Sequence, residues 1–362
     1  MKRLAGILVV AAVVVAVWLA LRALPRRSPP PAPVRETATP IPDRLPEHPD
    51  TVLEARLRAL VSGAPARCGI VAMDLGNGAI ARVNADTLIP LLSVVKLPVA
   101  IVVLDGVDQG KWSLSTPITL LPQDMHPRGW VGDRYPGGGG PVSLNRLLIA
   151  MLTRSDNSSA DALMRLVGGP HEVTRWLERH GIRDLHVDRT ERALGDDWYG
   201  LTPGVDTTES AEEIRETRSH VPEAVHDSAA REMLLDPRDT GTAEACVHLL
   251  ELLWSRKLLS STMTDTLESI LTRCRTGPGR LPGMLPKGTR IARKTGTGGI
   301  SEGITVAIND IGVIRLPNRH DVAIAVLIGS PRGPVHRAER LIARVARAVF
   351  DAWSPPDSIG HP

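Results

Sequence analysis

The sequence has few cysteines. Only Cys68, Cys246 and Cys274 occur among its 362 residues, an odd number with no C-x-x-C spacing. Such a set predicts neither a metal site nor a dense disulfide framework. Two interpretations stay open: a disulfide between Cys246 and Cys274 joining two helices, or three buried thiols.

The sequence also lacks a large excess of charge. Its formal net charge is +3. Residues 1–46 have a net charge of +5, so the remainder has a net charge of −2. With no zinc finger or other nucleic-acid motif, this distribution argues against a nucleic-acid partner. The histidines form no H-E-x-x-H motif, and Gly137–Gly140 lacks the spacing of a phosphate-binding loop. We therefore expect no metal and no other cofactor.

The first 24 residues predict export from the cytoplasm. An uncharged run of 18 residues, 4–21, follows Lys2 and Arg3 and is near the length that spans the hydrocarbon core. It is either a cleaved signal peptide or a transmembrane anchor, and the lack of a clean A-x-A after it favours the anchor. The basic start favours an inside N-terminus. The body is then periplasmic or extracellular, and an anchor at residues 4–21 would hold it at the inner membrane.

The composition divides the rest of the chain into three parts. Eight prolines in residues 25–46 predict an extended linker, placed at 25–47, because this segment cannot bury enough apolar surface to fold. Residues 48–353 form the expected folded domain, and 354–362 a disordered tail. We expect a monomer.

Apolar periodicity indicates strands at both ends of the folded domain and helices between them. Expected helices cover residues 50–62, 92–108, 143–152, 157–167, 171–180, 242–255, 262–274 and 335–352. Expected strands cover 68–75, 79–83, 291–295, 305–316 and 322–328, the first two joined by an Asn-Gly turn. The pattern predicts an α+β fold, an α/β sandwich in which both chain ends build a five-stranded antiparallel sheet. Helices flank the sheet, and an all-helical lobe is inserted.

Ser93 and Lys96 are the first candidates for chemistry. Their spacing of three places both side chains on one face of a helix. A serine hydroxyl is a weak nucleophile unless an adjacent base takes its proton. S-x-x-K arises readily by chance, and the alternative is a helix-capping serine beside a solvated lysine.

Two further motifs follow in order, Ser155-Asp156-Asn157 and Lys294-Thr295-Gly296-Thr297-Gly298. The set S-x-x-K, S-D-N and K-T-G resembles class A serine β-lactamases, in the superfamily of penicillin-binding proteins and β-lactamases. The segment Asp188–Leu194 resembles the Ω-loop segment in which that family places a glutamate, here Glu191. Residues 276–280 resemble a stretch in which some members place a second cation, here Arg280.

The resemblance implies a β-lactamase/transpeptidase-like fold and a hydrolase that opens the β-lactam ring of penicillins and cephalosporins. It makes Ser93 the acylated nucleophile, Lys96 or Glu191 the base, and Ser155 the relay of a proton to the leaving nitrogen. The backbone N–H groups of Ser93 and Thr297 would stabilise the oxyanion.

The resemblance also implies substrate-binding residues. Lys294, Arg280 and Thr295 would hold the substrate carboxylate, since planar donors suit that partner. Asn157 would contact the substrate side-chain amide, and Trp130 would form an aromatic wall beside the bound substrate.

Two departures concern the release of the acyl group. Gly195 stands where the family commonly has an asparagine that helps hold the hydrolytic water. The segment closing at Asp239, expected to pair with Arg189, is longer than the 6–16 residues of an ordinary Ω loop, with an excess at about 196–235. A capping box at Ser210 predicts a helix there. Two alternatives therefore stay open: a membrane-tethered D-Ala-D-Ala peptidase acting on peptidoglycan peptides, and a β-lactam sensor that does not hydrolyse.

Overall fold

The computed structural model describes residues 45, 48–64, 66–127, 129–135, 137–201 and 209–354, which all belong to one compact unit. The expected N-terminal apolar run, nearly all of the linker and the tail after Ser354 lie outside the described residues. Within the described ranges, no helix is both long enough and apolar enough to cross a membrane.

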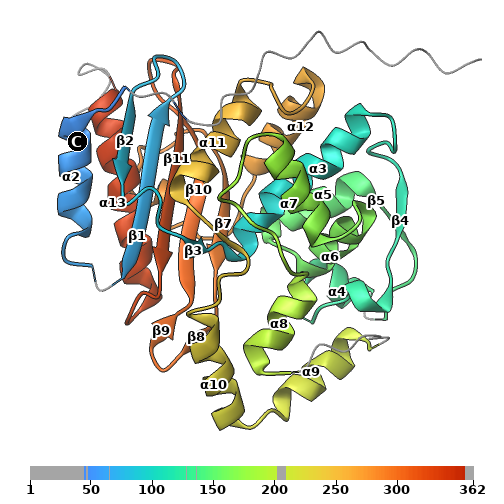
Figure 1. Ribbon diagram of the computed structural model, residues 1–362. Coiled ribbons are helices and arrows are strands. Elements are labelled where there is room, and N and C mark those ends of the chain that lie inside the picture. Colours follow the sequence, from blue (N-terminus) through green and yellow to red (C-terminus); the bar gives the residue numbers. More distant parts are fainter. Residues whose placement is uncertain are drawn as a thin grey trace, which may run out of the picture. The chain divides into compact units, whose positions relative to one another are not determined.

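The central sheet has five strands in the order β2-β1-β11-β10-β7, and all neighbours are antiparallel (Figure 1). Its strands are β1 (Arg67–Asp74), β2 (Ile80–Val83), β7 (Ile291–Thr297), β10 (Ala307–Arg315) and β11 (Asp321–Gly329). The middle strands are buried along almost their whole length because helices cover both faces of the sheet. The predicted fold class is confirmed.

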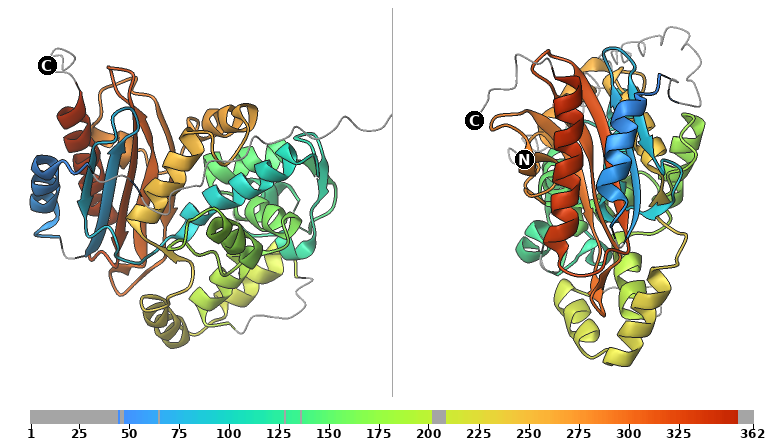
Figure 2. Two further views of the ribbon diagram at one scale, coloured as in Figure 1. Left: turned by 45° about the horizontal axis from the view of Figure 1, so that its top comes forward. Right: turned by 90° about the vertical axis from the view of Figure 1, so that its left-hand side faces the viewer.

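Two terminal helices, α2 (Thr51–Val61) and α13 (Val335–Trp353), lie side by side on one face of the sheet (Figure 2). The α2 helix begins where predicted because the Asp50 side chain accepts a hydrogen bond from the backbone N–H of Leu53. The indole N–H of Trp353 donates to the same Asp50 carboxylate at 3.0 Å. The two ends of the folded domain are thus joined directly.

The other face carries α11 (Ala243–Trp254) and the inserted helical lobe (Figure 1). The lobe follows the predicted helices closely. It comprises η1 (Leu92–Val95), α3 (Lys96–Asp108), η2 (Pro122–Asp124), α4 (Trp130–Arg134), α5 (Leu144–Arg154), α6 (Asn157–Leu166), α7 (Pro170–Arg179) and α12 (Ser261–Leu271). Two short ribbons, β3 (Ile89–Pro90) with β6 (Thr240–Gly241) and β4 (Pro117–Thr119) with β5 (Pro141–Ser143), connect its parts. The turn η3 (Leu281–Met284) precedes β7.

The long segment after Asp188 contains three helices: α8 (Glu191–Tyr199), α9 (Ala211–Ser219) and α10 (Glu223–Met233). The capping box predicted at Ser210 is present, with Glu213 as its partner. The α10 helix contacts the hairpin of β8 (Ile300–Ser301) and β9 (Ile304–Thr305), where the Ser301 hydroxyl donates to Asp227 at 2.8 Å. The enlarged segment is therefore packed against the strand pair that follows β7.

Three details differ from the expectations. Ser93 lies in a 3-10 turn and not in the first turn of an α-helix, because the α-helix begins only at Lys96. The expected strand 305–316 is interrupted at Val306, whose backbone N–H donates to the carbonyl of Gly299. The residues before Val306 belong to β9, which pairs with β8, and those after it belong to β10, which pairs with β7. All three cysteines are free thiols, so a bridge between Cys246 and Cys274 is wrong.

Candidate active site

Ser93 lies in a turn that the sheet holds in a strained conformation. The preceding residue, Leu92, has φ +53°, in the left-handed region that a leucine rarely adopts. Such a conformation costs about 1–3 kcal/mol and persists only where surrounding contacts fix it. The Asn309 side chain on β10 provides such contacts by donating to the carbonyls of Pro90 at 2.9 Å and Leu91 at 3.2 Å.

Lys96 is fully buried and its ammonium group is surrounded by oxygen atoms. Its Nζ lies 3.0 Å from Ser93 Oγ, 2.9 Å from the Ser155 carbonyl and 2.5 Å from Asn157 Oδ1. Glu191 Oε1 lies 3.3 Å away, and no other described group donates a hydrogen bond to that oxygen. Lys96 thus contacts the serine hydroxyl and the glutamate together.

A second buried lysine, Lys294, approaches the same point from β7. Its Nζ donates to Ser155 Oγ at 3.0 Å and to the Thr295 carbonyl at 2.7 Å. Burial, together with the nearby charge of Lys96, lowers the pKa of Lys294 to about 7. Lys96 Nζ lies 3.3 Å from the same Ser155 hydroxyl. That hydroxyl therefore sits between two amines.

Glu191 is the first residue of α8, and Asp161 on α6 holds it in place. The Asp161 carboxylate accepts the backbone N–H of Glu191 at 2.7 Å and that of Arg192 at 2.9 Å. His126 Nε2 lies 2.8 Å from the same carboxylate. A carboxylate at a helix N-terminus is favourable because the helix dipole is positive there.

Sequence reasoning missed Asp161, His126 and Asn309. A signal for Asp161 was available, because this carboxylate lies in the stretch of α6 that is otherwise buried and mostly uncharged. Asn309 interrupts an apolar strand in the same way and is completely buried. Polar side chains in such places are usually hydrogen-bonded.

The strand β7 runs directly against the serine turn. A Cβ atom on Gly296 would lie 2.3 Å from the Leu91 carbonyl oxygen, so only glycine allows this approach. The Thr297 hydroxyl accepts from Arg280 Nη2 at 2.7 Å. The side chain of Thr295 forms a hydrogen bond with the Thr276 hydroxyl.

Arg280 is buried behind the strand, and most of its donors are engaged by the protein. Its Nη1 donates to the carbonyls of Gly296 and Asn309, each at 2.9 Å, and its Nε lies 3.1 Å from Glu339. The guanidinium group thus acts on the site indirectly, by donating a hydrogen bond to the hydroxyl of Thr297.

Trp130 is the first residue of α4, and Asp156 fixes its position. The Asp156 carboxylate accepts the N–H of Val131 at 3.0 Å, which places Trp130 beside the Ser155–Asn157 segment. The guanidinium carbon of Arg146 lies 5.1 Å from the centre of the Trp130 ring. The half-buried indole is therefore held by a cation–π contact.

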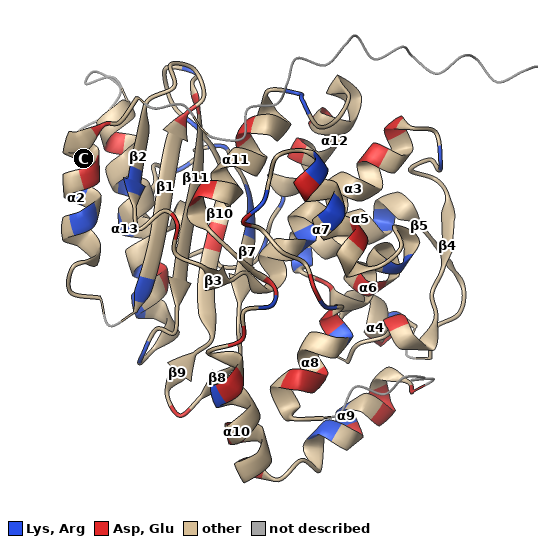
Figure 3. Ribbon diagram, in the orientation of Figure 1, with Lys and Arg blue, Asp and Glu red and all other residues tan. Residues whose placement is uncertain are grey.

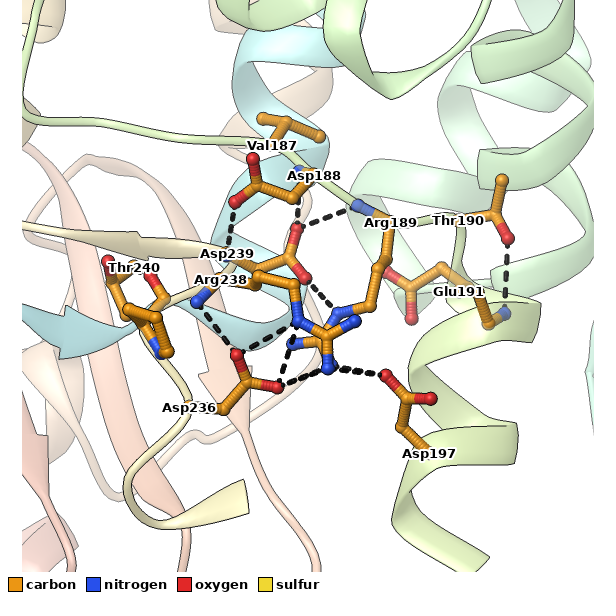
Figure 4. A network of polar contacts seen from close by, with 12 residues as sticks. Val187, Asp188, Arg189, Thr190, Glu191, Asp197, Asp236, Arg238, Asp239 and Thr240 are labelled. Atoms are coloured by element: carbon orange, nitrogen blue, oxygen red, sulfur yellow. Dashed lines mark hydrogen bonds and ion pairs between the residues drawn. The ribbon is translucent and has the colours of Figure 1, made fainter. Parts of the chain in front are cut away.

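A buried arginine joins the two ends of the enlarged segment, at Asp188 and at Asp239 (Figure 4). Arg189 Nε donates to Asp239 at 2.6 Å, which confirms the predicted pair, and its Nη1 donates to Asp197 at 2.6 Å and Asp236 at 2.9 Å. Asp239 also accepts the backbone N–H of Asp188 at 2.7 Å. The residues just before and just after the insertion are thus bonded to each other.

These features define a class of protein. Beside a sheet built from both chain ends, the structure brings together the S-x-x-K, S-D-N and K-T-G motifs that class A β-lactamases and penicillin-binding proteins share. A family model described as "Beta-lactamase enzyme family" matches residues 52–353. The chain belongs to this family.

Individual relatives agree with this assignment. The chain is 27% identical over 303 residues to Beta-lactamase VEB-1 of Pseudomonas aeruginosa, covering 83% of this chain and 90% of that protein. It is similar to the crystal structure of a β-lactamase from Chitinophaga pinensis, with TM-score 0.70, 28% identity and coverage of 83% and 99%. An ancestral class A β-lactamase matches with TM-score 0.67, 28% identity and coverage of 83% and 100%. The class A resemblance is confirmed.

Proposed function

We propose that this protein hydrolyses β-lactams through an acyl-enzyme on Ser93. The observation that carries the proposal is the position of Lys96, whose ammonium nitrogen lies 3.0 Å from Ser93 Oγ and 3.3 Å from Glu191 Oε1. A group for forming the acyl bond and a group for breaking it thus belong to one buried cluster.

In the acylation step, Ser93 Oγ attacks the lactam carbonyl and its proton passes to a base. The base is either the Lys96 amine, which contacts Ser93 Oγ directly and must first lose its ammonium proton, or Glu191 acting through an intervening water. The lactam C–N bond then breaks, and Ser155 passes a proton to the leaving nitrogen. This role is supported by the two amine contacts of the Ser155 hydroxyl, at 3.3 Å and 3.0 Å.

In the deacylation step, Glu191 removes a proton from a water that attacks the ester carbonyl, and the proton then returns to Ser93 Oγ. The backbone N–H groups of Ser93 and Thr297 stabilise the negative charge on the carbonyl oxygen in both steps. The contact between Asp161 and the start of α8 supports this role, since it fixes the backbone that carries Glu191.

Substrate binding is assigned to the residues around Lys294. The ammonium group of Lys294 and the hydroxyls of Thr295 and Thr297 bind the substrate carboxylate, while Arg280 orients the Thr297 hydroxyl. Asn157 binds the amide of the substrate side chain. Trp130 lines the approach to Ser155.

We further propose that the chain divides into residues 1–24 as a membrane anchor or signal peptide, 25–47 as a linker and 48–353 as the catalytic domain, with a tail at 354–362. The uncharged run 4–21 supports a periplasmic or extracellular location. We expect a monomeric domain. Membrane fractionation of cells expressing the full chain tests the anchor, and light scattering tests the monomer.

The catalytic proposal is tested with the purified full chain and a chromogenic cephalosporin. We expect multiple turnovers in the wild type and none in Ser93→Ala. The Glu191→Ala variant should form an acyl-enzyme that is visible by mass spectrometry and decays slowly. Glu244→Gln is the matched control, because this glutamate pairs with Arg82 and contacts no site residue in the described structure.

The outcomes separate the candidate functions. One equivalent of acyl-enzyme in the wild type, with neither lactam turnover nor release of D-alanine from a D-Ala-D-Ala peptide, would contradict hydrolysis and identify a β-lactam sensor. Acylation without lactam turnover, combined with release of D-alanine from a D-Ala-D-Ala peptide, would identify a peptidase.

A further inference from the structure

The enlarged loop meets α8 at Gly195. A Cβ atom on Gly195 would lie 2.4 Å from Arg218 Nη2, 3.0 Å from Cζ and 3.2 Å from Nη1. Gly195 is helical and its φ is not in the left-handed region, so its backbone conformation does not need glycine, but any side chain there would have to shift Arg218. The guanidinium group of Arg218, which comes from α9, occupies the volume beside the helix that a side chain at position 195 would fill.

This volume lies on the face of α8 that carries Glu191. Residues 191, 195 and 199 are spaced by four, so Glu191, Gly195 and Tyr199 form one stripe along the helix. The guanidinium carbon of Arg218 lies 5.3 Å from the centre of the Tyr199 ring. Arg218 therefore covers the two turns of the stripe that follow Glu191.

Arg218 is held in this position by a buried charge. Its Nη2 lies 3.0 Å from Asp196 Oδ1, and the other oxygen of Asp196 lies 3.0 Å from Arg192 Nε. The Arg218 side chain is only 13% exposed. Figure 3 shows that both α8 and α9 carry acidic as well as basic residues. The guanidinium group is thus fixed, and a methyl group at position 195 would have to displace it.

We propose that Arg218 is a positioning residue for deacylation, supplied by the insertion in the place that Gly195 leaves open. Packed on the Glu191 stripe and tied to Asp196, it holds the first turns of α8 at the distance from Lys96 that Glu191 needs. This inference rests on the proposed role of Glu191. It ties the unusual glycine and the enlarged loop to a single function.

The test separates deacylation from acylation in the full chain, by stopped-flow acylation rates and by mass spectrometry of the acyl-enzyme. We expect Arg218→Ala to slow deacylation about 10- to 100-fold, as for a small misplacement of a reacting group. The acylation rate should stay within about twofold. Arg215→Ala is the matched control, because Arg215 lies on the same helix, is exposed and pairs with Glu212 one turn away.

A double-mutant cycle distinguishes this role from general stabilisation. Gly195→Ala should slow deacylation by displacing the guanidinium group, but Gly195→Ala combined with Arg218→Ala should be no slower than the slower single variant. Arg218→Lys, which retains the charge, should recover part of the deacylation rate.

Several outcomes would overturn the proposal. Equal losses of acylation and deacylation, additive effects in the cycle, or a lower melting temperature with unchanged deacylation would each contradict a positioning role. If Arg218→Ala does not fold, Gly195→Ala decides the question alone, because it leaves Arg218 present. A wild-type enzyme that never deacylates would instead refute the proposed hydrolysis, which is a separate result.

Discussion

Asparagine in place of Asp161 would disturb the start of α8 while preserving the shape of the side chain. The carboxylate accepts the N–H groups of Glu191 and Arg192 and contacts His126. An amide keeps one acceptor oxygen but turns an N–H₂ group toward one of these donors. A hydrogen bond to a charged group contributes about 1.5–3 kcal/mol, and a buried unsatisfied donor costs about 1–3 kcal/mol. We expect a loss of about 2–4 kcal/mol in the free energy of unfolding.

Thermal unfolding and acyl-enzyme kinetics measure the two consequences of Asp161→Asn. At about 2 °C per kcal/mol for a domain of this size, the melting temperature should fall by about 4–8 °C. Deacylation should slow by at least about tenfold because Glu191 moves with its backbone. The control is Asp105→Asn, a buried carboxylate that accepts the Trp176 indole N–H at 2.9 Å. It should lower stability and leave deacylation intact. A variant of Asp161 that loses stability but deacylates normally would refute the reasoning.

Three further predictions follow from the site. Because the pKa of Lys294 is about 7, its charge is present below pH 7 and lost above it, so KM for a carboxylate-bearing substrate should rise between pH 6 and 8. In Lys294→Arg the charge persists, and a KM that still rises would contradict this assignment. Arg189→Ala removes the arginine from the buried Asp239, whereas Asp197 and Asp236 keep their pairs with Arg238. It should cost about 3–5 kcal/mol of stability and speed proteolysis within 209–235; unchanged proteolysis would contradict a role of Arg189 in holding the enlarged segment. Gly296→Ala places a methyl group 2.3 Å from the Leu91 carbonyl and should lower kcat/KM at least about 100-fold, as steady-state kinetics would show.

Much of the fold could be predicted because its signals are local. Asp50 marks the start of α2, the Asn-Gly turn marks the first hairpin, and helical periodicity marks α5 to α7. Ser93, Lys96 and Lys294 were identified as partners by the resemblance of three short motifs, in their order, to class A β-lactamases. Spacing within each motif does not by itself bring Lys294 to Ser93.

The parts that could not be predicted depend on contacts between distant segments. The 3-10 turn at Ser93 is held by Asn309, 216 positions further along the chain. The interruption at Val306 depends on pairing with Gly299 across a hairpin. The contact of Arg218 with Gly195 depends on how the insertion folds back on α8, which no periodicity in the sequence specifies.

The pairing of β1 with β11 has a consequence for how the enzyme is made. Arg67 on β1 pairs with Gly329 on β11, so β1 lacks its inner neighbour in the sheet until nearly the whole chain has been synthesised. Ser93 therefore leaves the ribosome long before Lys294, and long before Asn309, whose side chain fixes the turn that carries Ser93. Chains interrupted before Asp321 lack β11, the middle strand of the sheet. Premature termination should consequently yield unfolded products for proteolysis and not partly active fragments.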